Sequence, residues 1–208
     1  MKFEEMTVGA FIDELASNSP APGGGSVAAL CGSLASALTV MVGNLTVGKT
    51  KYQDSWNAAE NIISEGKKLN LEFISLMNKD TDAFNVFMAA MKMPKNTDEE
   101  KSVRLEAMEH AAKTATETPL STLETCVKLM DFVVLAAKYG NQNAISDAGV
   151  AALLAEAAGK AAAYNVKINL PGIKDKIFAD KCKERMFSAL KAIESGALET
   201  ADIVNGVI

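Results

Sequence analysis

The chain has 208 residues, of which 49% are hydrophobic and 23% are charged, and its net charge is −5. This length and composition are typical of one globular domain with a sizeable core. The negative charge argues against a nucleic-acid partner, because no excess of cations meets the phosphates. Three dispersed cysteines and a single histidine argue against disulfides, a metal site and a Ser-His-Asp triad. We therefore expect a cytoplasmic protein with free thiols and no bound metal.

The first predicted element is a short amphipathic helix within residues 1–17. Thr7 is a suitable cap for it. One face of this helix is apolar and carries Val8, Phe11, Ile12 and Leu15. The segment lacks the apolar stretch of a signal peptide.

A loop rich in proline and glycine follows, Ser19-Pro20-Ala21-Pro22-Gly23-Gly24-Gly25-Ser26. Its prolines and glycines oppose a helix before Ser26, which is a good N-cap for the helix that we expect after it. The unpaired N–H groups of a helix start, together with the helix dipole, favour an anion or a polar head group. The candidate binding residues here are Pro22, Gly23, Gly24, Gly25 and Ser26. The alternative is a flexible loop that only leads into a helix.

The uncharged helix predicted over about 26–49 is long enough to span a membrane. Its serines, threonines and many small residues are better suited to close packing inside a bundle, so we expect no membrane partner. A helix that is polar on no side should be surrounded, which places it at the centre of the bundle.

Apolar residues recur at three- and four-residue steps over most of the remaining chain. This periodicity predicts helices over about 54–91, 97–139 with a bend at Pro119, 144–165 and 174–194. No alternating strand, repeat or linker is found, so the prediction is a single all-α domain over 1–208. Its architecture is a helical bundle with long central helices. The helices over 26–49 and 144–165 are apolar or small nearly all round, and we expect them to pack across the two-fold axis of a homodimer.

One carboxylate lies on a helix stripe that should be buried. Asp80 is four residues from both Leu76 and Phe84, whereas Asp82 is turned about 200° away. A carboxylate in that position is costly unless it is paired, hydrogen-bonded or used in chemistry. The sequence leaves two explanations open, a functional group and a salt bridge to a lysine at the edge of the bundle.

Further polar side chains gather at helix ends. They are Asn44 and Lys49 at the end of the uncharged helix, Lys95 in a turn, and Asn143, Ser146 and Asp147 before the alanine-rich helix. Each has a plain structural explanation as a C-terminal cation, a solvated turn or a cap. Several such clusters at the ends of helices in one bundle suggest a cleft.

Several of these segments occur, in this order, in a known family. They are Ser19–Ser26, Met41–Lys49, Asp80 ahead of Ala83-Phe84, Met93-Pro94-Lys95 and Asn143–Ala151. Together they resemble the cyclodeaminase/cyclohydrolase family of tetrahydrofolate enzymes over nearly the whole chain. Met93 replaces a leucine of the family pattern, a change that conserves volume. The resemblance implies an all-helical homodimer that binds folate, with Asp80 in the position of the active-site aspartate.

The resemblance implies one of two reactions. A 5,10-methenyltetrahydrofolate cyclohydrolase adds water to the methenyl carbon and leaves 10-formyltetrahydrofolate, whereas a formiminotetrahydrofolate cyclodeaminase releases ammonia. We expect the cyclohydrolase, because the chain resembles the stand-alone enzymes in length and shows no formiminotransferase domain. The alternatives are the cyclodeaminase and a non-catalytic binding module.

In this interpretation a tetrahydrofolate derivative is the substrate, and no prosthetic group is required because the methenyl carbon is already electrophilic. Asp80 would take a proton from water, and Lys49 would donate a hydrogen bond to the developing oxyanion or the pterin. Asn143, Ser146 and Asp147 would read the pterin edge. The other candidate substrate contacts are the glycine loop, Asn44 and Lys95. Burial raises the pKa of Asp80 and a nearby cation lowers it, so the sequence leaves the sign of the shift open.

Overall fold

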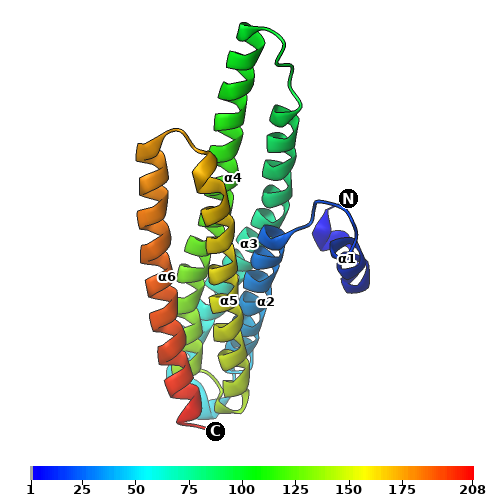
Figure 1. Cartoon of the computed structure of the whole chain (residues 1–208). Helices are drawn as coiled ribbons and strands as arrows, with labels where there is room; N and C mark the ends of the chain where they lie inside the picture. The colour runs from blue at the N-terminus through cyan, green and yellow to red at the C-terminus, as the bar shows by residue number, and fades with distance from the viewer. Residues whose placement is uncertain (1) are drawn as a thin grey trace.

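The computed structural model describes residues 2–208, and Met1 lies outside the described part. Over these residues the chain forms α-helices and short 3₁₀ turns and no strand, which confirms the all-α prediction. The helices are α1 (Val8–Leu15), α2 (Gly24–Asn44), α3 (Trp56–Met91), α4 (Asp98–Tyr139), α5 (Ile145–Asn169) and α6 (Lys176–Asn205). Figure 1 shows α2 to α6 side by side as a bundle, with α1 beside the start of α2.

Several predicted helix boundaries are wrong. α2 begins at Gly24 after an extended Gly23, so Ser26 lies within the first turn and is not the N-cap. α2 ends at Asn44 rather than near Lys49, and a 3₁₀ turn over Thr50–Ser55 precedes α3. By contrast, α4 continues through Pro119 to Tyr139 as one helix, which agrees with the predicted range. α6 runs beyond 194 to Asn205, because buried side chains continue at helical spacing in its last turns.

α2 packs against α3, α5 and α4. Its small residues allow a close approach to α3, since a Cβ at Gly32 would overlap with the ring of Phe73. Ser36 Oγ donates a hydrogen bond of 2.6 Å to the C=O of Gly66 in the same contact. By length and composition alone α2 could cross a membrane, with a mean hydropathy of 1.8, but buried core helices meet the same criterion and 56% of this stretch is buried.

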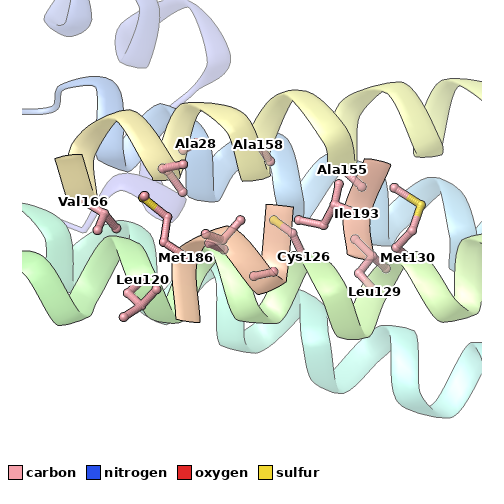
Figure 2. Packing of buried hydrophobic residues seen from close by; sticks show 14 of the residues in the cluster. Ala28, Leu120, Cys126, Leu129, Met130, Ala155, Ala158, Val166, Met186 and Ile193 are labelled. Carbon is pink, nitrogen blue, oxygen red and sulfur yellow. The ribbon is translucent and has the colours of Figure 1, made fainter. Parts of the chain in front are cut away.

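The largest core cluster joins α4, α5 and α6 along their length (Figure 2). Large side chains of α4 and α6, such as Leu129 and Ile193, pack beside the alanines of α5, such as Ala155 and Ala158. Because alanine is small, α5 can lie close to both neighbours without leaving a void. This packing fixes the position of α5, whose two ends carry polar residues.

α2 and α5 lie side by side and run in opposite directions. Gly24, at the start of α2, lies next to Asn165 near the end of α5. At the other end, Asn141 Nδ2 donates a hydrogen bond of 3.0 Å to the C=O of Leu45, just after α2. α3 and α4 extend past the start of α2 as a long hairpin (Figure 1). The base of this hairpin, where it leaves the rest of the bundle, therefore lies beside the start of α2 and the end of α5.

α1 forms where it was predicted, and Thr7 Oγ1 accepts a hydrogen bond of 3.1 Å from the N–H of Ala10. Of its predicted apolar face only Phe11 is buried, in a small cluster with residues of α2 and α3. Val8, Ile12 and Leu15 are exposed in the single chain. Much of the apolar surface of α1 therefore has no cover within one subunit.

Candidate active site

A pocket of about 320 Å³ opens where α2 begins, at the base of the α3–α4 hairpin. This volume is suited to a small ligand or to the head group of a larger one. Its walls include Pro20 and the three glycines of the loop, Asp80, Phe84 and Phe87 of α3, and Asn165 and Asn169 of α5. The predicted glycine loop and Asp80 thus meet in one pocket, while Pro22 is buried within the loop.

Asp80 caps a helix to which it does not belong. Gly23 has no side chain that could accept from the first turn of α2, and the carboxyl group of Asp80 takes that place from α3. Ser26 Oγ donates to Asp80 Oδ2 at 3.0 Å, and the N–H of Ser26 also bonds to this carboxyl group. Ser26 is fully buried. It therefore orients Asp80, and it is not among the residues that line the pocket.

Burial raises the pKa of Asp80 above its ordinary value, and the hydrogen bonds from Ser26 oppose this rise by stabilising the carboxylate. The pKa of Asp80 is therefore shifted upward, a direction that the sequence left open. In residues 2–208 no lysine, arginine or histidine forms an ion pair with Asp80, which contradicts the salt-bridge explanation. A half-buried carboxyl group with a raised pKa is suited to accept a proton from a bound reactant.

Gly25 makes the approach of Asp80 to α2 possible. A Cβ at this position would lie 2.5 Å from Asp80 Cγ and 2.7 Å from Asp80 Oδ2, so any side chain would displace the carboxyl group. Gly24 is less crowded, because a Cβ there would meet Asn165 Nδ2 at 3.6 Å, an ordinary contact. The strict requirement for glycine in this loop is therefore at Gly25.

Asn165 and Asn169 are not among the predicted site residues, yet both line the pocket. Asn165 Nδ2 donates to the C=O of Ala161 at 2.9 Å, and Asn169 Nδ2 donates to the C=O of Ala115 at 2.7 Å. They follow the buried Ala162 by three and seven residues, on a stripe that should be apolar. Asn165 and Asn169 therefore lie on such a stripe just as Asp80 does, and their positions could have been predicted in the same way.

A second group of predicted residues lies at the opposite end of the bundle. It comprises Asn44, Lys49, Asn143, Ser146 and Asp147, which surround the end of α2 and the start of α5. α2 has 21 residues, so this group lies about 30 Å from Asp80 within one chain. Lys95 lies in the turn between α3 and α4, and the end of α3 is itself about 16 Å beyond Asp80. One chain alone does not bring these residues to Asp80.

Asn141 holds this opposite end together. Its N–H donates to Thr46 Oγ1 at 2.9 Å, and its Oδ1 accepts from the N–H of Asn143 at 3.1 Å. Asn141 thus caps the 3₁₀ turn Gln142–Ala144, whereas α5 begins after Ala144 without the predicted side-chain cap. The side chains of Asn44, Lys49, Asn143 and Ser146 are exposed. Among residues 2–208 no group of three His, Cys, Asp or Glu side chains is arranged to hold a metal ion.

The chain is similar to known proteins over nearly its whole length. Residues 7–188 match the family model described as Formiminotransferase-cyclodeaminase. The chain is 40% identical to a methenyltetrahydrofolate cyclohydrolase of Methylorubrum extorquens, over 92% of this chain and 91% of that protein. It is 35% identical to a formimidoyltransferase-cyclodeaminase of Gallus gallus, of which it covers 35%.

A solved structure agrees with these matches. The crystal structure of formiminotetrahydrofolate cyclodeaminase from Thermotoga maritima superposes with a TM-score of 0.89, covers 98% of both chains, and is 29% identical in sequence. The resemblance inferred from the sequence motifs is thereby confirmed. The chain belongs to the formiminotransferase-cyclodeaminase family.

Proposed function

We propose that this protein is a 5,10-methenyltetrahydrofolate cyclohydrolase. The observation that carries the proposal is Asp80, a half-buried carboxyl group held at the start of α2 in a pocket walled by Phe84 and Phe87. The methenyl substrate is a cation on a flat ring system, which a carboxylate and aromatic side chains are suited to bind. The similarity to the Methylorubrum extorquens cyclohydrolase over 91% of its length favours this reaction over the alternative.

The hydration step needs a proton acceptor, and Asp80 supplies one. The oxygen of water bonds to the methenyl carbon while Asp80 takes one of its protons. The bond from this carbon to N5 then breaks, and its electron pair goes to N5, which takes the proton back from Asp80. The remaining hydroxyl proton leaves to solvent as the formyl C=O forms on N10. The methenyl cation and water thus give 10-formyltetrahydrofolate and one proton.

The second candidate reaction is that of a formiminotetrahydrofolate cyclodeaminase. The observation that favours it is the superposition on the Thermotoga maritima cyclodeaminase, which covers 98% of both chains. In this reaction N10 would attack the carbon of the protonated formimino group, and Asp80 would carry the proton from N10 to the former formimino nitrogen. The bond from the carbon to that nitrogen would then break, ammonia would leave with the electron pair, and the methenyl cation would remain.

A paired assay tests the proposal. Purified protein is mixed with methenyltetrahydrofolate to follow the loss of the methenyl absorbance, and with formiminotetrahydrofolate to follow ammonia. We expect rapid hydration and a fall in kcat of about 10²- to 10⁴-fold in Asp80→Asn. The amide keeps an oxygen that can accept from Ser26, so the variant should remain folded. Ammonia release alone would support the cyclodeaminase, silence in both assays a binding module, and a fully active Asp80→Asn would remove Asp80 from the mechanism.

The proposed unit of function is a homodimer. The outer face of α5 carries an exposed apolar stripe at helical spacing, and α2 adds Leu34. The exposed fractions are 46% for Val150, 66% for Leu153, 69% for Tyr164, 77% for Ile168 and 49% for Leu34. Exposed apolar side chains that recur along one helix of a protein are typical of an interface, and a two-fold axis lets the same face cover itself.

A two-fold axis perpendicular to α2 and α5 would exchange the two ends of this face. Because α2 and α5 are antiparallel, Gly24 and Asn165 lie at one end and Asn44 and Ser146 at the other. The partner subunit's Lys49 would then lie at the mouth of the Asp80 pocket. The same exchange would bring the rest of the second group to the substrate, which is the role that the sequence predicted for it.

The proposed substrate is a tetrahydrofolate derivative, and no prosthetic group is required because its methenyl carbon is electrophilic. Lys95 remains a candidate contact for a part of the substrate that extends out of the pocket along the hairpin. Cys31, Cys126 and Cys182 are free thiols, which supports a reducing, cytoplasmic location.

A further inference from the structure

Asn165 and Asn169 are polar side chains of the pocket that the proposed reaction does not use. They lie four residues apart on α5, so they are neighbours on one face of that helix, whereas Asp80 enters the pocket from α3. We propose that these two amides recognise the hydrogen-bond donors of a reduced pterin and thereby select tetrahydrofolate over oxidised folate. This inference rests on the proposed function. It adds Asn165 and Asn169 to the residues for which the sequence predicted contact with the pterin edge, which are Asn143, Ser146 and Asp147.

Backbone carbonyl groups fix the orientation of both amides. Pro119 has no N–H, so the C=O of Ala115, four residues earlier in α4, has no intrahelical partner, and Asn169 Nδ2 donates to it at 2.7 Å. Asn165 Nδ2 donates to the C=O of Ala161 at 2.9 Å. In residues 2–208 no donor bonds to either Oδ1. Each amide therefore has its nitrogen held on the backbone and its oxygen left as an acceptor for a ligand.

Two acceptors one helical turn apart match one edge of a tetrahydropterin. Its 2-amino group and its N8–H are both donors on that edge. N5, which bears the reacting carbon, lies opposite N8 in the ring that contains both nitrogens. Binding the donor edge to α5 would therefore turn N5 toward α3 and Asp80. Phe84 and Phe87 would cover the faces of the rings.

The same pair of acceptors would discriminate against oxidised folate. In folic acid N8 has no hydrogen and is itself an acceptor, so it would oppose an Oδ1 that pairs with N8–H in the reduced form. The 2-amino group is present in both oxidation states. The asparagine that pairs with N8–H should therefore set the preference for the reduced ring. The asparagine that pairs with the 2-amino group should contribute equally to the binding of both ligands.

Calorimetric titration of the full chain with tetrahydrofolate and with folic acid tests this. Tetrahydrofolate lacks the one-carbon group, so neither reaction proceeds during the measurement. We expect wild type to bind tetrahydrofolate more tightly than folic acid. Of Asn165→Leu and Asn169→Leu, one should lower this preference about tenfold. The other should weaken the binding of both ligands by a similar factor. Asn85→Leu, at an exposed position of α3 outside the pocket, is the control and should change neither.

Thermal melting checks that each variant is folded. Asn165→Leu is the safer variant, because its amide bonds only to its own helix, whereas Asn169 joins α5 to α4. The inference is overturned if both variants keep the wild-type affinities and preference, or if wild type binds the two ligands equally or not at all. Turnover of wild type is measured separately. Selective binding without turnover in either assay would reject the proposed function and leave the pterin assignment standing.

Discussion

The hydroxyl group of Ser26 acts on Asp80 in two ways. It holds one carboxyl oxygen in place with a hydrogen bond of 3.0 Å, and it offsets part of the rise in pKa that burial causes. Asp80 must be ionised before it can take a proton from water. The pH range in which the proposed enzyme works therefore depends on this hydrogen bond.

We predict that Ser26→Ala moves the acidic limb of the pH–kcat profile to higher pH. Without the hydroxyl donor the pKa of Asp80 rises further, so a smaller fraction of the carboxyl group is ionised at a given acidic pH. The loss of kcat should be largest at the acidic end and should shrink as pH rises and Asp80 becomes ionised in both proteins. The methenyl absorbance assay, repeated from acidic to neutral pH, measures this.

Ser36→Ala is the matched control for that experiment. Ser36 is also a fully buried serine of α2, but it donates to the C=O of Gly66 and not to Asp80. Its removal should cost stability without shifting the pH profile. An equal shift in both variants, or an unshifted profile in Ser26→Ala, would contradict the proposed role of Ser26.

At this scale the sequence predicted Asp80 and Ser26 as site residues, but not the contact between them. Asp80 was found because helix geometry fixes which residues share a stripe. Its partner Ser26, 54 positions away, was assigned by its side-chain type to a local N-cap, because a cap supplied by another helix leaves no local pattern. The position of Asn169 follows the same stripe rule, but its hydrogen bond could not be predicted, since its partner is a carbonyl group left unpaired by Pro119 in a different helix.

At the scale of the helix, the start of α2 combines two functions. Its glycine backbone forms a wall of the pocket, and its first turn meets the carboxyl group of Asp80. Both require that nothing projects from Gly25 toward α3. The loop is therefore constrained by the position of Asp80 as much as by any ligand.

We predict that Gly25→Ala lowers kcat about 100-fold, because the added methyl group displaces the carboxyl group of Asp80 from its position beside the substrate. Gly24→Ala is the comparison in the same turn, and its methyl group would make only an ordinary contact with Asn165. It should lose less than about tenfold. Steady-state kinetics with methenyltetrahydrofolate measure both variants, and equal losses would contradict the steric explanation.

Helix ends could be predicted where the signal is local. The side chains of Thr97 and Glu100 form a capping box, with bonds of 3.1 and 3.3 Å, and α4 ends at Tyr139 before Gly140, in agreement with the predicted range 97–139. The start of α2 could not, because three glycines carry no preference strong enough to mark a first helical residue. There the long-range contact with Asp80 decides the boundary.

At the scale of the whole molecule, one subunit leaves two features incomplete. The apolar stripe of α5 and the outer side chains of α1 have no cover. The two groups of predicted site residues also lie about 30 Å apart, at opposite ends of α2. Sequence motifs specify which residues matter but not which subunit supplies them, so this separation became visible only in the fold. A single antiparallel dimer contact through α2 and α5 would cover the α5 stripe and bring the two groups together.

We predict that two inactive variants restore activity when their subunits are mixed. Asp80→Asn and Lys49→Ala are each expected to be nearly inactive as homodimers. In a mixed dimer, one site would combine the intact Asp80 of the Lys49→Ala chain with the intact Lys49 of the other, and the second site would lack both. Random exchange makes half of the dimers mixed, with one working site in two, so about a quarter of wild-type activity should return.

The outcome separates a shared site from a self-contained one. If Asp80 and Lys49 acted in the same subunit, every chain in the mixture would carry a defect in its own site and no activity would return. Leu153→Glu, placed in both variants, provides the control. Leu153 is exposed in the single chain, and the proposed dimer would bury the new charge on the α5 stripe, which should dissociate the dimer and abolish the recovery. Light scattering measures the dissociation directly. A monomeric Leu153→Glu protein with full wild-type activity would show that neither the interface nor the partner subunit's Lys49 is needed.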